Sequence, residues 1–146
     1  MILAIDPGQD TGWALFNSSE RLEGCGLGEP KTGDHLCIER ILVECPRLRP
    51  RGEKNPNAIL TLARNAGQWG GRLERLGPVE FILPNEWKGS APKDVSHARI
   101  WAKLDDAEKG IVDDAFRAHP GRNGMAPSRR HNVLDALGIG LWGVGR

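Results

Sequence analysis

The sequence predicts a small three-layer α/β fold in which a mixed, roughly five-stranded sheet is flanked by helices. Short apolar runs typical of strands fill the first part of the chain, and segments with helical periodicity then alternate with one more strand. A length of 146 residues suits one domain, and 39% apolar with 27% charged residues is an ordinary globular composition. We therefore expect residues 1–146 to form a single domain.

Five segments predict strands. Pro7 and Gly8 separate the first two apolar runs, which is typical of a strand hairpin. Glycines weaken the third segment, since glycine has no side chain to pack in a sheet. The fourth segment ends in Ile-Leu-Val followed by Glu44, and Pro84 closes the fifth. The predicted strands are residues 2–6, 12–16, 22–27, 37–44 and 79–83.

Four segments predict helices. The clearest has Asn55 as N-cap and Pro56 at its first position, places apolar residues at helical spacing from Leu62 to Leu76, and stops at Gly77. Three glycines inside it each cost up to about 1 kcal/mol, so we expect another backbone to pack closely there. The predicted helices are residues 56–76, 92–104, 107–116 and 131–143, and residues 117–130 predict a loop rich in proline, glycine and arginine.

Several classes of protein are disfavoured. No run of 18 or more apolar residues is present, so no membrane span is predicted, and the absence of a basic leader segment argues against secretion. Three cysteines without a C-x-x-C pair indicate a reducing compartment, which we take to be the cytoplasm. A zinc site remains an alternative to core cysteines, although the spacing of Cys25, His35, Cys37 and Cys45 matches no structural zinc pattern.

Charge is balanced overall but unevenly distributed. The net charge of +1 does not indicate any class of binding partner. Basic residues gather in segments 47–54 and 115–131, whereas acids gather in segment 105–114. Charge alone slightly favours solvated surfaces for these segments, and the alternative is that the two basic segments contact a phosphate backbone.

Three acids stand where an α/β fold displays functional groups. Asp6 and Glu44 end predicted strands, and Asp135 lies in the first turns of the last predicted helix. Each acid alone has an ordinary structural alternative. Asp6 would begin a turn, Glu44 would form a surface ion pair, and Asp135 would stabilise the N-terminus of its helix. Converging carboxylates repel one another unless a hard dication neutralises them, and two Mg²⁺ ions can drive phosphodiester hydrolysis. Together, the three acids predict metal-assisted cleavage of a nucleic acid strand.

Motifs in the same order resemble those of RuvC-type Holliday junction resolvases, a family of the RNase H-like superfamily. Residues 2–14 are similar to the opening of these enzymes, and Leu42-Val43-Glu44 to their second acidic motif. Residues 54–58 and the glycine-containing helix resemble the central helix, and residues 84–88, with Lys93 beyond them, resemble the proline and lysine segment of phage members. Residues 132–137 (NVLDAL) occupy the place of a D-x-x-D-A-L or H-x-x-D-A-L motif.

The resemblance, which spans nearly the whole chain, implies an RNase H-like fold and a homodimer that makes paired nicks in four-way DNA junctions with Mg²⁺ or Mn²⁺. By position, Asp6, Glu44 and Asp135 would hold two metal ions, and Lys93 would stabilise charge at the scissile phosphate. A phage-encoded member would act in the host cell cytoplasm. The residues expected to bind DNA are Arg47, Arg49, Arg51, Lys54, Lys88, Arg129 and Arg130.

The chain departs from the family pattern in two places. Asn132 stands three residues before Asp135, where the family has Asp or His, and His131 precedes it. Either Asn132, as a neutral oxygen ligand, or His131, after a small shift of the helix start, would complete the metal site, and His131 has the alternative of a phosphate contact. The segment between Asp6 and Glu44 is also short, which indicates a shortened phage-type member and leaves the dimer contacts of that region open.

Other functions remain as alternatives. The acids alone do not distinguish a junction resolvase from a debranching nuclease that cuts forks and flaps, or from an RNase H-like nuclease that cuts RNA. Asn132 motivates a catalytically degenerate junction-binding protein. The D-x-G-x-T-G-like loop from Asp6 to Gly12 also resembles that of actin-like ATPases, but their fold needs two domains and this chain predicts one.

Overall fold

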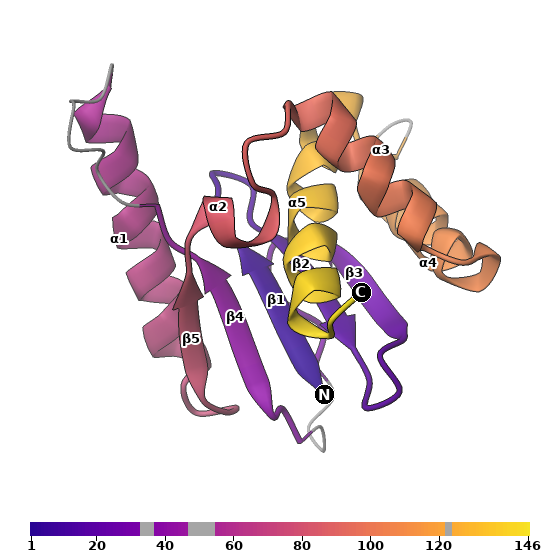
Figure 1. The fold of residues 1–146 in the computed structure, drawn as a ribbon, viewed down its shortest axis with the longest axis horizontal. Coiled ribbons are helices and arrows are strands. Elements are labelled where there is room, and N and C mark those ends of the chain that lie inside the picture. The colour runs from indigo at the N-terminus through magenta and orange to yellow at the C-terminus, as the bar shows by residue number, and fades with distance from the viewer. Residues whose placement is uncertain (33–36, 47–54, 122–123) are drawn as a thin grey trace.

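The computed structural model describes residues 1–32, 37–46, 55–121 and 124–146, and it contains one five-stranded sheet (Figure 1). The strands are β1 (Ile2–Asp6), β2 (Gly12–Phe16), β3 (Leu22–Leu27), β4 (Arg40–Glu44) and β5 (Val79–Ile82). Their order is β3-β2-β1-β4-β5; β1, β2 and β3 pair antiparallel, and β4 and β5 run parallel to β1. This is an RNase H-like arrangement, so the predicted fold class is confirmed.

Helices cover both faces of the sheet, which gives the three predicted layers (Figure 1). The helices are α1 (Pro56–Leu73), α2 (Pro84–Trp87), α3 (Lys93–Lys103), α4 (Asp106–Ala118) and α5 (Pro127–Gly143). Helix α1 packs on one face, and α3, α4 and α5 lie on the other. Within the described ranges, no helix is both long and apolar enough to cross a membrane.

Alternation along the strands divides the core between the two faces. In β1, Leu3 and Ile5 point to the α1 side, whereas Ala4 points to the α5 side. The neighbouring strand β4 follows the same pattern, with Val43 toward α1 and Leu42 toward α5. Because successive side chains of a strand face opposite ways, every second residue of β1 and β4 faces α5.

Glycines let α5 lie unusually close to the sheet. A β-carbon at Gly12 of β2 would overlap the backbone carbonyl oxygen of Asn132 in α5. Further along α5, the Phe16 ring occupies the space that a β-carbon at Gly140 would need, and Leu42 occupies that space at Gly143. The helix is therefore in close contact with β2 and β4, and it lies closer to the sheet than larger residues would allow.

The element boundaries differ from the predictions at several points. Helix α5 begins at Pro127, inside the predicted loop, because proline suits the first turn of a helix. Helix α2 was not predicted, since four residues carry no helical periodicity. Strand β4 begins at Arg40 rather than at residue 37, α1 ends at Leu73, and α4 is longer than predicted.

The expectation that a backbone packs against the glycines of α1 is wrong. Among the described residues, no atom outside the helix backbone lies within 4 Å of a β-carbon placed at Gly67 or Gly71, and at Gly70 the nearest atom belongs to the Phe81 ring, 2.6 Å away. Two apolar residues of the helices, Leu62 of α1 and Val95 of α3, are 38% exposed.

Glu108 is buried, although the acidic segment around it was interpreted as a solvated surface. Its side chain is 1% exposed and accepts hydrogen bonds from both guanidinium nitrogens of Arg146, at 2.7 and 2.8 Å. The backbone amide of Leu22 donates a further hydrogen bond to it. The Arg146 hydrogen bond is the main reason why the pKa of Glu108 is lowered to about 2. Glu108 thus joins α4 to β3 and to the end of the chain.

We expect Gly12→Ala to lower the free energy of unfolding by about 3 kcal/mol, because backbone rather than a flexible side chain occupies the space of the new methyl group. Gly67→Ala is the matched control: it adds the same methyl group to open space within a helix and should raise stability by up to about 1 kcal/mol. Urea denaturation followed by circular dichroism measures both. Equal effects of the two substitutions would contradict close packing at Gly12.

Candidate active site

Asp6 and Glu44 lie side by side on the face of the sheet that α5 covers. They end the neighbouring parallel strands β1 and β4, whose register pairs Ile5 with Val43 immediately before them. Asp6 follows Ala4 by two residues, and Glu44 follows Leu42 by two, so both acids point to the α5 side. Asp135 comes from α5 itself, and its side chain is 9% exposed.

The three carboxylates act on one another electrostatically. The pKa of Asp6 is raised to about 8, chiefly by burial and then by the negative charges of Asp135 and Glu44. Lys88 and Lys93 act in the opposite direction and lower it. A buried carboxylate between two others is a position where additional positive charge would be stabilising.

Glu44 is held by two residues at and just after α2. The indole N–H of Trp87 donates a hydrogen bond to its Oε2 at 2.6 Å, and the ammonium of Lys88 lies 3.4 Å from the same oxygen. Lys88, expected as a DNA-binding residue, thus lies beside an acid of the candidate site. Trp87 was not among the predicted site residues.

Asp135 is held by two residues of α3. His97 Nε2 lies 2.8 Å from Oδ1, and the ammonium of Lys93 lies 3.1 Å from Oδ2. Lys93 and His97 are four residues apart, so they share one face of the helix. That spacing was the available signal for His97, which was not among the predicted site residues. Lys93 stands beside the acids, and its role toward a phosphate stays a prediction.

Asn132 and His131 lie in the first turns of α5, near the same site. The Asn132 side chain is next to Gly8, in the loop that follows Asp6. The pKa of His131 is lowered, first by burial and then by the charge of Lys93, while Asp135 acts to raise it. Both residues are within the surroundings of Asp135, so the two alternatives for completing the metal site remain.

Besides Lys88, two more of the residues expected to bind DNA have partners within the chain. Arg129 makes two hydrogen bonds to Asp10, of 2.6 and 2.9 Å, which tie the β1–β2 loop to α5. Arg130 donates to the carbonyl oxygen of Met125, and its guanidinium lies over the Phe116 ring. Their contact with DNA stays a prediction. Arg47, Arg49, Arg51 and Lys54 lie outside the described residues.

The acids suit a hard dication by chemistry, although they are not arranged as a metal cluster. Among the described residues, no three His, Cys, Asp or Glu side chains converge closely enough to hold an ion. Lysines neutralise Glu44 and Asp135 instead. Oxygen ligands around a buried carboxylate with a raised pKa are nevertheless the donor set that Mg²⁺ and Mn²⁺ prefer. Of the cysteines, only Cys25 is buried, and His35 is outside the described residues.

Comparison with known proteins gives similarity at the level of structure only. No family model and no curated protein matches the chain. A structure of Thermus thermophilus RuvC is similar over 96% of this chain and 90% of its own, with a TM-score of 0.46 and 18% identity. T. thermophilus RuvC in complex with a Holliday junction substrate has the same coverage, a TM-score of 0.44 and 16% identity.

We expect Asp6→Asn to stabilise the metal-free protein at pH 8. A raised carboxyl pKa disfavours the ionised form in the folded state, so stability falls as pH rises from about 4 toward about 8, and a neutral amide removes this loss. The melting temperature should exceed that of the wild type by at least about 4 °C at pH 8, and the difference should shrink toward pH 4.

The control is Asp106→Asn, which changes a fully exposed acid of α4 and should leave the melting curve unchanged at both pH values. Addition of Mg²⁺ should raise the melting temperature of the wild type and not that of Asp6→Asn, because only the former offers the buried charge. A variant that melts below the wild type at pH 8 would contradict the electrostatic account of Asp6.

Proposed function

We propose that this chain is a structure-selective DNA endonuclease that cuts four-way junctions by metal-dependent phosphodiester hydrolysis. The observation that carries the proposal is that Asp6 is buried within electrostatic reach of Glu44 and Asp135 on one face of the sheet, although the three acids come from distant parts of the chain. Carboxylates gathered in this way are suited to divalent metals, and divalent metals are suited to cleavage of phosphodiesters. The motifs that resemble RuvC-type resolvases support DNA junctions as the substrate.

The carboxylates of Asp6, Glu44 and Asp135 would hold two Mg²⁺ or Mn²⁺ ions, with Asn132 or His131 as the additional ligand. Such ions supply an activated water and stabilisation of the leaving oxygen. The Asn132 amide brings no negative charge, so we expect weaker metal affinity on its side of the site.

Lysines give the site positive charge of its own. The Lys93 side chain is 56% exposed, so its ammonium can reach both Asp135 and a phosphate that enters from solvent. We assign to Lys93 the stabilisation of negative charge on that phosphate. His97 is more buried and binds the other oxygen of Asp135, so it would orient the carboxylate rather than touch DNA.

A junction-binding protein without cleavage activity is the second candidate, and two observations favour it. Lysines already neutralise Glu44 and Asp135, and a neutral Asn132 stands where the resembled family has an acid or histidine. Such a protein would bind branched DNA tightly and leave it intact in either metal.

We expect nicking of an immobile four-way junction in Mg²⁺ or Mn²⁺ and none in EDTA. Asp6→Asn, Glu44→Gln and Asp135→Asn should each lower the nicking rate by at least about 100-fold while junction affinity is kept, because each removes a charged metal ligand without changing side-chain size. Gel assays of labelled junctions measure cleavage and binding in the same preparation.

Asp106→Asn, at an exposed position of α4, is the control and should cut at the wild-type rate. Cutting rates on duplex, fork and flap substrates of the same sequence measure the specificity for junctions. Equal cutting of forks and flaps would change the proposal to a debranching nuclease, and tight binding without cleavage would support the second candidate.

Paired nicks require two active sites, and we propose a second copy of this chain as the partner. Large apolar side chains remain exposed on α1 and on the edge strand β5: Leu60 at 58%, Leu62 at 38% and Phe81 at 51%. A twofold-symmetric dimer would cover this surface on both copies. It would also bring two acidic sites to one symmetric junction.

We expect Leu60→Glu to convert the dimer to a monomer in sedimentation velocity experiments, because the introduced charge would be buried in the interface. The monomer should lose coordinated cutting of the two junction strands. Val95→Glu, which changes an exposed apolar residue of α3, is the matched control and should leave the dimer intact. A dimer that survives Leu60→Glu would place the interface elsewhere.

A further inference from the structure

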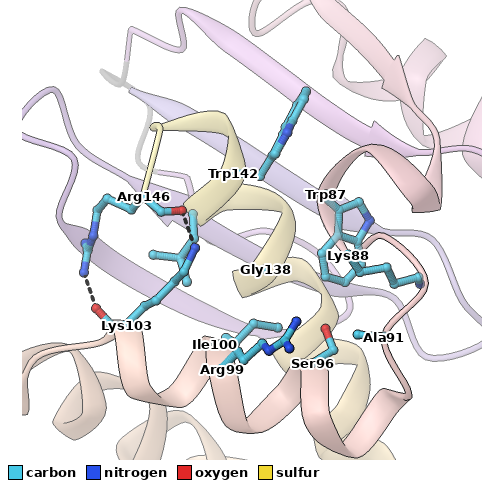
Figure 2. A pocket seen from close by; sticks show the side chains of 11 residues that line it. Trp87, Lys88, Ala91, Ser96, Arg99, Ile100, Lys103, Gly138, Trp142 and Arg146 are labelled. Carbon is cyan, nitrogen blue, oxygen red and sulfur yellow. Dashed lines mark hydrogen bonds between the residues drawn. The ribbon is translucent and has the colours of Figure 1, made fainter.

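A pocket of about 200 Å³ lies on the α5 side of the sheet, between α3, α5 and the segment that follows α2 (Figure 2). Trp87, Ile100 and Trp142 supply apolar walls, one from each of three helices. Its floor is α5 at Gly138, where a β-carbon would overlap the ring of Trp87 and approach Ile100. The glycine therefore lets the Trp87 ring pack against the helix and form one wall.

Cations surround this basic pocket. Its lining contains Lys88, Arg99, Lys103 and Arg146, and no Asp or Glu among the described residues. Lys103 and Arg146 form a fixed group, because the Lys103 ammonium donates to the Arg146 carbonyl oxygen at 2.7 Å and Glu108 holds the Arg146 guanidinium. Arg99 is exposed, and Figure 2 shows its side chain extending from α3 toward α5.

The size and chemistry of the basic pocket suit one sugar-phosphate unit. Pockets for whole small molecules measure roughly 300 to 1,000 Å³, so this one is too small for a complete nucleotide. A guanidinium such as that of Arg99 binds phosphate through two parallel hydrogen bonds. Tryptophan and isoleucine walls suit the apolar face of a sugar.

The basic pocket shares a wall with the candidate active site. The ring of Trp87 lies against Gly138 in the pocket, while its indole N–H donates to Glu44. Lys88 also contributes to both, since its ammonium reaches Glu44. A strand bound at the acids is thus next to the pocket.

We propose that the basic pocket binds a phosphate group, and that its source is the DNA strand next to the scissile phosphate. The second half of this proposal rests on the proposed function, because it takes the strand at Asp6, Glu44 and Asp135 as given. The first half rests on the pocket alone.

Inorganic phosphate tests the pocket without DNA. In a titration followed through the tryptophan indole N–H signals, we expect saturable shifts for Trp87 and Trp142 in the wild type. Sodium chloride at the same ionic strength should not reproduce them, and Arg99→Ala should abolish them. Shifts that persist in Arg99→Ala, or that chloride reproduces, would overturn the phosphate site.

Salt dependence of junction binding tests the source. We expect Arg99→Ala to weaken binding about tenfold at 0.1 M salt and to reduce the slope of log affinity against log salt by about 0.9, the value for one lost phosphate contact. Arg75→Ala removes the same charge on the other face of the sheet, between α1 and β5, and should leave the slope unchanged. Ala91→Leu, which narrows the pocket without changing its charge, should also weaken binding.

The outcomes separate this proposal from the proposed function. An unchanged slope in Arg99→Ala, in a protein that still cuts junctions, would overturn DNA as the source and leave the endonuclease in place. A wild type that neither binds nor cuts junctions would overturn the proposed function together with the DNA source, and the phosphate titration would then decide the pocket by itself.

Discussion

The close contact between Gly12 of β2 and the backbone of Asn132 in α5 determines the position of the candidate site. Because no side chain separates the strand from the helix there, contact between backbone atoms, rather than a choice of side-chain rotamers, fixes the distance of α5 from the sheet. Gly140 and Gly143 continue the contact along the helix. Asp135 is held on the same helix, so its carboxylate stands over the ends of β1 and β4, where Asp6 and Glu44 end their strands. A site that depends on such contacts has little freedom to adjust.

The sequence was sufficient where structure follows from neighbouring residues. Short apolar runs, each followed by an acid, identified Asp6 and Glu44 at strand ends, and the Asn55-Pro56 pair marked the start of α1, where Asn55 accepts a hydrogen bond from the amide of Ala58. Pro127 was an equally good start signal for α5, but the surrounding proline, glycine and arginine residues favoured a loop. The proline signal for a helix start was present there, but the loop-like composition around it outweighed that signal.

Partners distant in sequence could not be predicted. Nothing near Glu44 indicates that the Trp87 indole binds it, and nothing near Glu108 indicates Arg146. Glu108 does share a helix face with Val112 and Phe116, at steps of four, so periodicity could have marked its burial although not its partner. Chemistry-bearing residues were predictable by type and position, whereas the charges that balance them depended on the tertiary fold.

The order of elements along the chain has a consequence for biosynthesis. The sheet is complete once β5 has left the ribosome, and α4 then covers β3, but β1 and β2 stay uncovered on the α5 face until the last helix follows. The contacts that bring Asp135 to Asp6 span most of the chain and carry the loop-closure cost of long-range pairing, so they form late in folding. A nascent chain would thus carry two of the acids without the third, and the proposed chemistry would be inactive until synthesis had passed α5.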